Sequence, residues 1–156
     1  MTDATHQGQP DANGFIKIED GDFAGWRTRP RDSFCYQAAG PFYSKKLEDG
    51  SIVCAIKVEK KHLNVLGMVH GGALMTFADH ALFQISQYCY GPDEDAITVT
   101  FNSEFLGAAR EGEVVEARGE VTREGRSMIF VRGMLTADGK PCLAFSAALK
   151  RIKLRD

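Results

Sequence analysis

The longest regular hydrophobic pattern in the chain has the period of an α-helix and lies near the middle of the sequence. Apolar or small side chains recur there at intervals of three and four residues: Leu74, Phe77, Ala78, Ala81, Leu82, Ile85 and Cys89. This spacing places them on one face of a helix that packs on a core. The helix should begin at Gly71-Gly72 and stop at Gly91-Pro92, because Pro cannot continue a helix.

Strand-like runs lie on both sides of this helix. Two precede it, at residues 42–47 and 52–58, and the Asp49-Gly50 pair between them is a strong hairpin signal. Four follow it, at residues 96–106, 113–123, 127–137 and 142–154. Side chains alternate along a strand, so one face of the first of these runs should carry Ile97, Val99, Phe101, Ser103 and Phe105.

These elements predict an α+β fold with one long central helix and an antiparallel sheet of five to six strands. Short polar turns between the strands imply antiparallel pairing, and helix and sheet would form two layers. A chain of 156 residues suits one domain with one sizeable core. We place this domain at residues 23–156, after a flexible polar arm at residues 1–22. Residues 128–131 are apolar on both faces, which favours burial of the outer sheet face by oligomerisation.

Composition narrows the class of partner. Hydrophobic residues make up 44% and charged residues 26% of the chain, and the net charge is -2. There is no basic footprint for nucleic acid or for a membrane surface, and no apolar run of membrane-spanning length. We therefore expect a cytoplasmic protein. The cysteines are widely spaced and suggest buried thiols rather than metal ligands, so neither a metal nor an organic cofactor is expected: Cys35, Cys54, Cys89 and Cys142.

One helix residue does not fit the core stripe. Asp79 lies about 140° around the helix from Leu74, and its one-turn neighbours are Met75, Thr76 and Phe83. It could be a solvated carboxylate on an exposed face. The flanking Met and Phe favour a second buried face instead, where a partly desolvated carboxylate could act as a general base or nucleophile.

Several short motifs together resemble one known family. They are Asn64, Val69-His70-Gly71-Gly72, the helix segment that ends at Asp79, and a polar residue on the next strand. With the order of two strands, a helix and four strands, this set resembles the hotdog-fold acyl-CoA thioesterases. It is most similar to the phenylacetate-pathway type and the thioesterase superfamily member 2 group. The resemblance covers roughly residues 34–152 and implies the hotdog fold.

The resemblance also implies catalytic roles. Asp79 would be the nucleophile or general base, and the Gly71 amide would polarise the thioester carbonyl. Asn64 and His70 would shape the site and the leaving thiol, and Thr98 would help to hold the attacking water. Each of the last three has a plainer interpretation, because Asn and His are common in turns and Thr is a good strand former.

Other residues are expected to contact the substrate, acyl-CoA. Gly72 opens the helix, and Met75 and Phe83 flank the carboxylate. Arg126 and Ser127 lie in a turn that is similar to a family turn near the nucleotide, although they could also be solvated residues only. The acyl group could be aryl or aliphatic.

The spacing of Gly71 and Asp79 predicts a shared site. Eight residues of helix separate them by about 12 Å along the axis, whereas a catalytic carboxylate must lie about 3 Å from its reacting atom or water. Asp79 would therefore act on a carbonyl held at the Gly71 of a partner helix. This predicts a homodimer with two shared sites, and the resemblance implies the same, often as a dimer of dimers.

Two other functions remain open at this point. One is a hotdog dehydratase or isomerase, which usually relies on a catalytic His in a different motif. The other is a non-catalytic acyl-CoA-binding protein, which would normally need an output module. The mid-helix acid after His-Gly-Gly favours hydrolysis.

Overall fold

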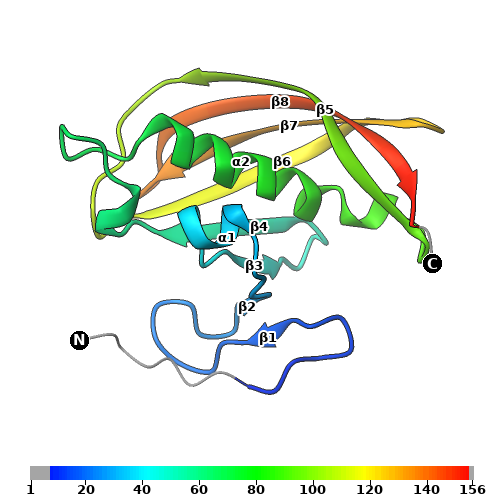
Figure 1. Cartoon of the computed structure of the whole chain (residues 1–156), viewed down its shortest axis with the longest axis horizontal. Helices are drawn as coiled ribbons and strands as arrows, with labels where there is room; N and C mark the ends of the chain where they lie inside the picture. The colour runs from blue at the N-terminus through cyan, green and yellow to red at the C-terminus, as the bar shows by residue number, and fades with distance from the viewer. Residues whose placement is uncertain (1–7, 155–156) are drawn as a thin grey trace.

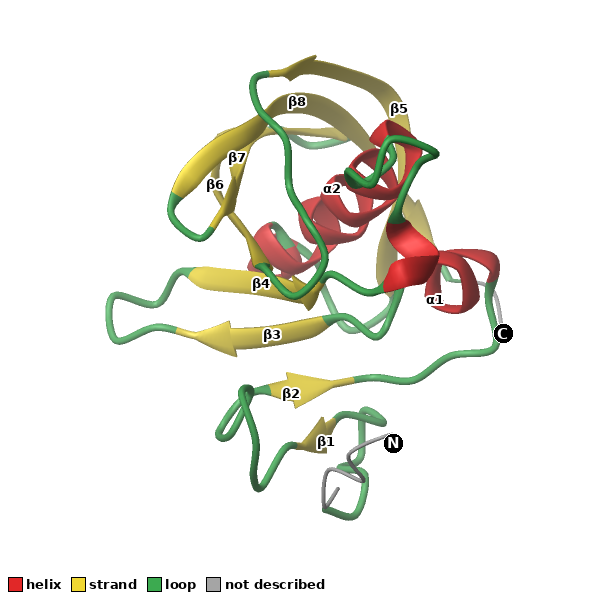
Figure 2. Cartoon of the chain, turned by 90° about the vertical axis from the view of Figure 1, so that its left-hand side faces the viewer, coloured by secondary structure: helices red, strands yellow, loops and turns green. Residues whose placement is uncertain are grey.

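A long helix, α2 (Gly71–Ile85), runs through the centre of the molecule, and a curved antiparallel sheet wraps around it (Figures 1 and 2). The computed structural model describes residues 8–154. The strands are β1 (Ile16–Lys17), β2 (Arg27–Thr28), β3 (Tyr43–Lys46), β4 (Ile52–Lys57), β5 (Glu94–Phe105), β6 (Val114–Glu124), β7 (Met128–Ala137) and β8 (Lys140–Lys153). The shorter helices are α1 (Phe34–Ala39), which lies beside α2, and the 3-10 turns η1 (Lys60–His62) and η2 (Gln87–Cys89).

The strands form one sheet in the order β1-β2-β3-β4-β6-β7-β8-β5. Every neighbouring pair is antiparallel. The two Asp-Gly turns form as the sequence predicts: Gly50 has φ 87°, and Asp138 and Gly139 have φ 45° and 80°. At Asp138-Gly139 both turn residues have positive φ, which is typical of a type I′ hairpin, whose twist matches that of the flanking strands. β5 follows α2 but pairs with β8, so it is an edge strand.

The hydrophobic stripe of α2 faces the core as predicted. Phe77, Ala78, Ala81 and Leu82 are 0% exposed, and the rest of the stripe is buried as well. Burying one such leucine or phenylalanine contributes roughly 1.5–3 kcal/mol. This packing fixes the rotation of α2 about its axis, and hence the direction of every other side chain on it.

The predicted helix end is wrong by several residues. The α-helix stops at Ile85, and Ser86 takes φ -93° and ψ 5°. The Ser86 hydroxyl donates a hydrogen bond to the Leu82 carbonyl, 2.7 Å away. The chain then tightens into η2, which still buries Cys89. The backbone thus leaves the α-helix before the Gly91-Pro92 stop.

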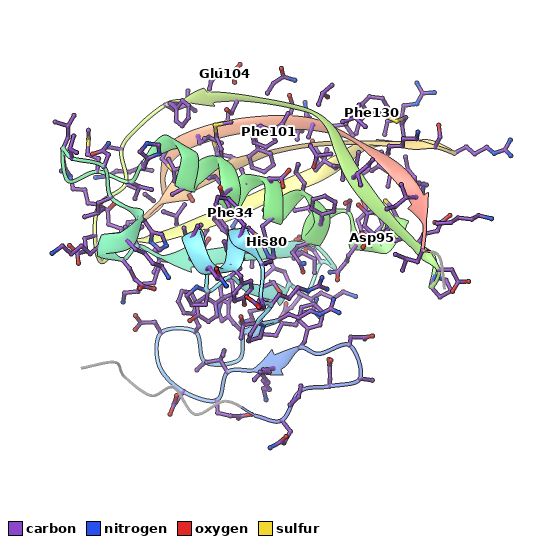
Figure 3. The ribbon with its side chains drawn as sticks, viewed as in Figure 1. Phe34, His80, Asp95, Phe101, Glu104 and Phe130 are labelled. Carbon is purple, nitrogen blue, oxygen red and sulfur yellow. The ribbon has the colours of Figure 1, made fainter. Side chains whose placement is uncertain are left out.

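The alternation predicted for β5 holds only in part. A bulge between Thr98 and Thr100 shifts the register against β8. Ile97 and Val99 are therefore about half exposed, at 49% and 53%, whereas Ala96 is buried. Beyond the bulge, Phe101 lies between the sheet and α2, and Glu104 and Phe130 lie on the outer side (Figure 3). A bulge breaks the period of two, so Thr98 rather than Val99 faces α2.

The sheet has eight strands instead of the five to six predicted, because two-residue strands carry too short a pattern to be recognised. β1 and β2 extend the sheet beyond β3. β1 lies within the expected arm, as does Ile18, which is 1% exposed. Phe23 then stacks on Tyr43, with ring centroids 3.9 Å apart. Residues 1–7 of that arm lie outside the described residues, and the domain boundary at residue 22 stays a prediction.

Candidate active site

Asp79 and Thr98 meet between α2 and β5. The Thr98 hydroxyl donates a hydrogen bond to Asp79 Oδ1 over 2.8 Å. Asp79 is half-buried, and no residue of the described chain donates to its Oδ2. The carboxylate is thus held in one orientation, with one oxygen available to a water molecule or a carbonyl carbon. The bulge in β5 makes this contact possible, since it turns Thr98 toward the helix.

The N-terminus of α2 presents a backbone donor. His70 is its N-cap, and its Nδ1 accepts a hydrogen bond from the Gly72 N–H at 2.9 Å. The Gly71 N–H donates to no group within residues 8–154. It lies at the positive end of the helix dipole, where an oxyanion would be stabilised. A Cβ at Gly71 would come within 3.0 Å of the Phe105 ring, so this ring already lies against the glycine.

Asn64 shapes the loop that leads into this N-terminus. Its Oδ1 accepts hydrogen bonds from the N–H groups of Leu66 and Met68, at 2.9 and 3.2 Å. These contacts are those of a turn-forming Asn, and they match its plainer interpretation. A direct contact of Asn64 with substrate stays a prediction.

The structure gathers the predicted site residues into three separate groups within one chain. Asp79 and Thr98 form the first, and His70, Gly71 and Asn64 the second, about 12 Å away along α2. Arg126 and Ser127 form the third. They lie in the β6–β7 turn, next to the opposite end of α2. Arg151 links the two there, because it donates hydrogen bonds to the carbonyls of Gly125 and Cys89.

The expected substrate contacts on α2 differ in exposure. Met75 is 38% exposed. Gly72 is also exposed, although its N–H is taken by the His70 ring. Phe83 is half-buried and lines a cavity. Its position four residues after Asp79 places that cavity one helical turn beyond the carboxylate.

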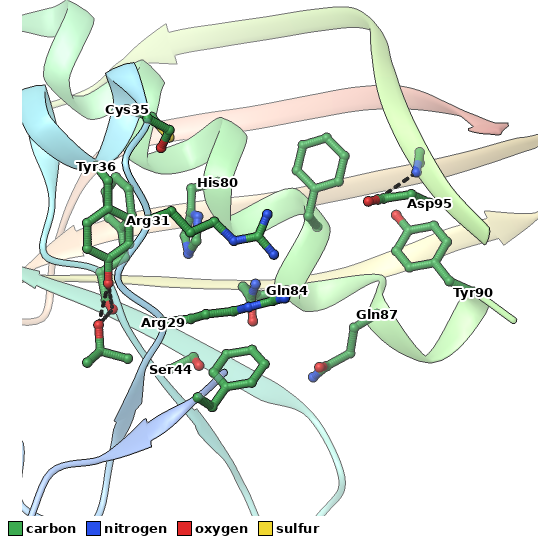
Figure 4. Close-up of a pocket in the computed structure, with 16 residues that line it drawn as sticks. Arg29, Arg31, Cys35, Tyr36, Ser44, His80, Gln84, Gln87, Tyr90 and Asp95 are labelled. Carbon is green, nitrogen blue, oxygen red and sulfur yellow. Dashed lines mark hydrogen bonds between the residues drawn. The ribbon is translucent and has the colours of Figure 1, made fainter. Parts of the chain in front are cut away.

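This cavity has a volume of about 420 Å³ and was not predicted from the sequence. It lies between α2 and the segment from Phe15 to Tyr36, and Figure 4 shows Arg29 and Arg31 reaching into it from that segment. His80 and Gln84 of α2 lie on one side, and Gln87, Tyr90 and Asp95 on another. The sequence signal that could have indicated it is the alternating run Arg27-Thr28-Arg29-Pro30-Arg31, because in an extended segment this spacing puts three arginines on one side.

His80 lines this cavity with a neutral imidazole ring. Its ring stacks on Phe42, with centroids 4.2 Å apart. Burial, and to a lesser extent the positive charge of Arg31, lower the pKa of His80 to about 4. No sequence pattern marked His80 as a site residue, and its uncharged ring contributes an apolar surface at neutral pH.

Among residues 8–154, no group of three or more His, Cys, Asp or Glu side chains could hold a metal ion. In the same range, no helix is long and apolar enough to cross a bilayer.

Comparison with known proteins defines the class. The family model of the thioesterase superfamily matches residues 66–144, about half of the chain, including α2 and Thr98. The chain therefore belongs to the thioesterase superfamily, and it is a thioester hydrolase.

Individual relatives agree with this class. A Pseudomonas aeruginosa protein provisionally named an esterase is 31% identical over 105 residues, which cover 67% of this chain and 78% of the relative. Human acyl-coenzyme A thioesterase 13 is 29% identical over 93 residues, which cover 58% of this chain and 66% of the relative.

Solved structures confirm the predicted hotdog fold. A Haemophilus influenzae thioesterase superposes with a TM-score of 0.71 at 18% identity, covering 80% of this chain and 87% of the other. A hypothetical thioesterase of Streptococcus pneumoniae, solved with coenzyme A, gives 0.67 at 23% identity, covering 77% and 92%.

Proposed function

We propose that this protein hydrolyses an acyl-CoA thioester to a free acid and coenzyme A, with Asp79 as the catalytic carboxylate. The observation that carries the proposal is the half-buried Asp79, fixed by Thr98 on a helix whose first amide, at Gly71, has no partner among residues 8–154. The relatives named acyl-CoA thioesterases support coenzyme A as the thiol.

The Asp79 carboxylate and the Gly71 N–H suit two different parts of the reaction: attack on the thioester carbon and stabilisation of the charge on the carbonyl oxygen. Asp79 takes a proton from a water molecule, whose oxygen forms a bond to the thioester carbon. Alternatively, the Asp79 oxygen attacks first, and water later releases the acid. The carbonyl oxygen gains negative charge, which the Gly71 N–H stabilises as a preorganised donor. The C–S bond then breaks, and the thiolate of coenzyme A leaves and takes up a proton.

The distance between Asp79 and Gly71 within one helix supports a site to which two chains contribute. Asp79 cannot reach a carbonyl that is bound about 12 Å away at its own Gly71. We infer a two-fold dimer in which Asp79 works with the partner's Gly71. His70 caps the helix that presents this amide, and Asn64 holds the loop before it.

The edge strand β5 supports a specific dimer. It has twelve residues and pairs with β8 alone among the described strands, and an open edge of this length is a template for a second strand. In an antiparallel β5 pair centred between Phe101 and Asn102, Thr98 lies roughly opposite the partner's Phe105. Because Phe105 covers Gly71, this register brings Asp79 to the partner's Gly71.

The dimer also gives the third group of residues a role. In one chain, Arg126 and Ser127 lie at the end of α2 that is remote from Gly71. Antiparallel helices bring this end of one chain closer to the Gly71 end of its partner. We propose that Arg126 and Ser127 contact the phosphates of coenzyme A there, where a guanidinium is well suited to phosphate.

The test is a panel of aryl and aliphatic acyl-CoA substrates, with thiol release as the readout, for the wild type and Asp79→Asn. Asn keeps the shape of the side chain but cannot act as base or nucleophile. Turnover should fall by about 10² to 10⁴ or more, while the circular dichroism spectrum and the size of the assembly stay unchanged. A purified Asn variant with near-wild-type turnover would refute the assignment of Asp79.

The same panel, with an enoyl-CoA added, separates the competing functions. A dehydratase or isomerase would change the absorbance of enoyl-CoA without releasing thiol. A binding protein would bind acyl-CoA and leave it intact. Either result, in place of thiol release, would contradict the proposed hydrolysis.

A further inference from the structure

We propose that the cavity between α2 and residues 15–36 receives the far end of the acyl group, and that Arg29 and Arg31 select acyl groups that end in a carboxylate. This inference rests on the proposed hydrolysis of acyl-CoA and names the substrate class for the same site. The cavity is of a size suited to a small ligand.

The cavity lies about one helical turn from Asp79, and the nearest residues that line it follow Asp79 on α2 and precede Thr98 on β5. Phe83 follows Asp79 by one helical turn, and Ala96 precedes Thr98 by two positions on the same face of β5. Both Phe83 and Ala96 line the cavity. An acyl chain whose carbonyl lies at Asp79 can therefore extend along α2, past Phe83, into this space.

The charges around the cavity favour an anion. Arg29 and Arg31 both point into it (Figure 4), and neither forms an ion pair within residues 8–154. Asp95 is the acidic residue in the lining, and its Oδ1 accepts a hydrogen bond from the Ala96 N–H at 2.8 Å. The lining thus carries two guanidinium groups and one carboxylate, that of Asp95. The terminal carboxylate of an acyl group would give the arginines a partner with the bidentate geometry that arginine favours.

Part of the cavity wall is apolar, and this part includes the residues nearest to Asp79 along α2 and β5. Phe42 lines the cavity with the neutral His80 ring stacked on it. Phe83 and Ala96 add further apolar surface. Methylene groups would pack against these apolar side chains without losing hydrogen bonds, while Arg29 and Arg31 supply the positive charge for a terminal carboxylate.

The segment that carries the arginines is held in place. The Thr28 side chain is buried, and its hydroxyl donates to the Phe42 carbonyl over 2.7 Å. Arg27 lies over the Phe15 ring at 4.4 Å and donates to Gln87 at 3.3 Å. This anchoring preorganises Arg29 and Arg31, which reduces the entropy lost when an anion binds.

The experiment compares kcat/KM for adipyl-CoA and hexanoyl-CoA, which share a six-carbon chain and differ in the terminal carboxylate. This length is chosen because in shorter chains the carboxylate can attack its own thioester. The wild type should prefer adipyl-CoA by about 10-fold or more. Arg29→Gln and Arg31→Gln should each lower kcat/KM for adipyl-CoA by about 10- to 100-fold, the range for a hydrogen bond to a charged group, and leave hexanoyl-CoA within about twofold.

Arg118→Gln is the matched control, because Arg118 is an exposed arginine already paired with Glu116 on the same strand. It should leave the substrate ratio unchanged. A wild type that hydrolyses hexanoyl-CoA as well as adipyl-CoA would overturn the proposal. So would an equal loss on both substrates in the arginine variants together with weaker inhibition by free coenzyme A, since the arginines would then bind its phosphates.

A separate readout distinguishes failure of this inference from failure of the proposed function. If no acyl-CoA is turned over, the proposed hydrolysis is contradicted, but the preference for a terminal carboxylate is still to be tested. Calorimetry on Asp79→Asn then measures the dissociation constants of both CoA esters without turnover. Tighter binding of adipyl-CoA that is lost in Asp79→Asn/Arg31→Gln supports the carboxylate preference, and equal binding refutes it.

Discussion

The Thr98 hydroxyl on β5 donates a hydrogen bond to the Asp79 carboxylate on α2. Thr98→Val keeps the branched shape but removes the hydrogen bond to Asp79, so the carboxylate loses its fixed orientation. A hydrogen bond to a charged group contributes about 1.5–3 kcal/mol, so kcat should fall by about 10- to 100-fold. Thr100→Val is the control, since the Thr100 hydroxyl accepts a hydrogen bond from the Ala148 N–H on β8 and has no hydrogen bond to Asp79. Full activity of Thr98→Val would remove Thr98 from the site.

His80 should make stability depend on pH. Its pKa is lowered to about 4 in the folded state, first by burial and then by Arg31, whereas an unfolded His titrates near 6.5. The unfolded state therefore binds more protons between these values, and stability falls as the pH drops from about 6.5 to about 4. The upper bound is about 3 kcal/mol.

Urea unfolding at several pH values, for the wild type and His80→Phe, measures this contribution of His80. Phe keeps a ring against Phe42 but cannot titrate. As the pH falls, the unfolding free energy of the wild type should decrease more than that of His80→Phe, so the variant should become more stable relative to the wild type. A difference that stays constant from pH 7 to 4 would contradict a lowered pKa at His80.

At the scale of elements, the pair β6–β7 depends on two glycines that face each other. Gly133 lies opposite Gly119, and a Cβ at Gly133 would overlap both the Phe145 ring and the Arg118 carbonyl. Gly133→Ala should therefore destabilise the protein by about 1–3 kcal/mol, the usual cost of overpacking. At Gly91 a Cβ would have ordinary contacts only, 3.6 Å from Glu94, so Gly91→Ala should stay within about 0.5 kcal/mol. Equal melting temperatures for the two variants would show that the sheet adjusts freely.

At the scale of the whole molecule, two inactive variants should restore each other when mixed. Asp79→Asn lacks the carboxylate, and Gly71→Pro lacks the amide N–H. A mixed dimer with shared sites has one site with both defects and one with neither. Random exchange makes about half of the dimers mixed, so about a quarter of wild-type activity should return. Both variants must fold and exchange subunits, which native mass spectrometry can verify. If the exchanged mixture stays inactive, each site is built within a single chain.

The backbone at Gly71 suits this experiment. Gly71 is not among the residues with positive φ, and His70 before it has ψ 135°, as a residue before Pro requires. Pro is also acceptable in the first turn of a helix. Because a new Cβ would press on the Phe105 ring, Gly71→Ala serves as the control: it adds the same Cβ but retains the N–H. It should therefore keep more activity than Gly71→Pro.

The sequence by itself determined the core helix, the two Asp-Gly hairpins and the order of the long strands along the chain. Each of these follows from local chemistry: a period of 3.6 or 2, or the backbone freedom of glycine in a turn. It also indicated Asp79, because a carboxylate beside large apolar side chains stands out in a helical pattern. Family membership confirms the class of activity, while the role of Asp79 remains a proposal.

Tertiary structure decided what depends on long-range contacts. The bulge in β5 turns Thr98 toward Asp79, and no local pattern marks it, because it is set by the register against β8. The arginines at residues 29 and 31 lie about fifty residues from His80 in sequence, and they share a cavity with it only because the N-terminal segment packs beside α2. Side chains so far apart carry no common period, so only the folded chain could place them together.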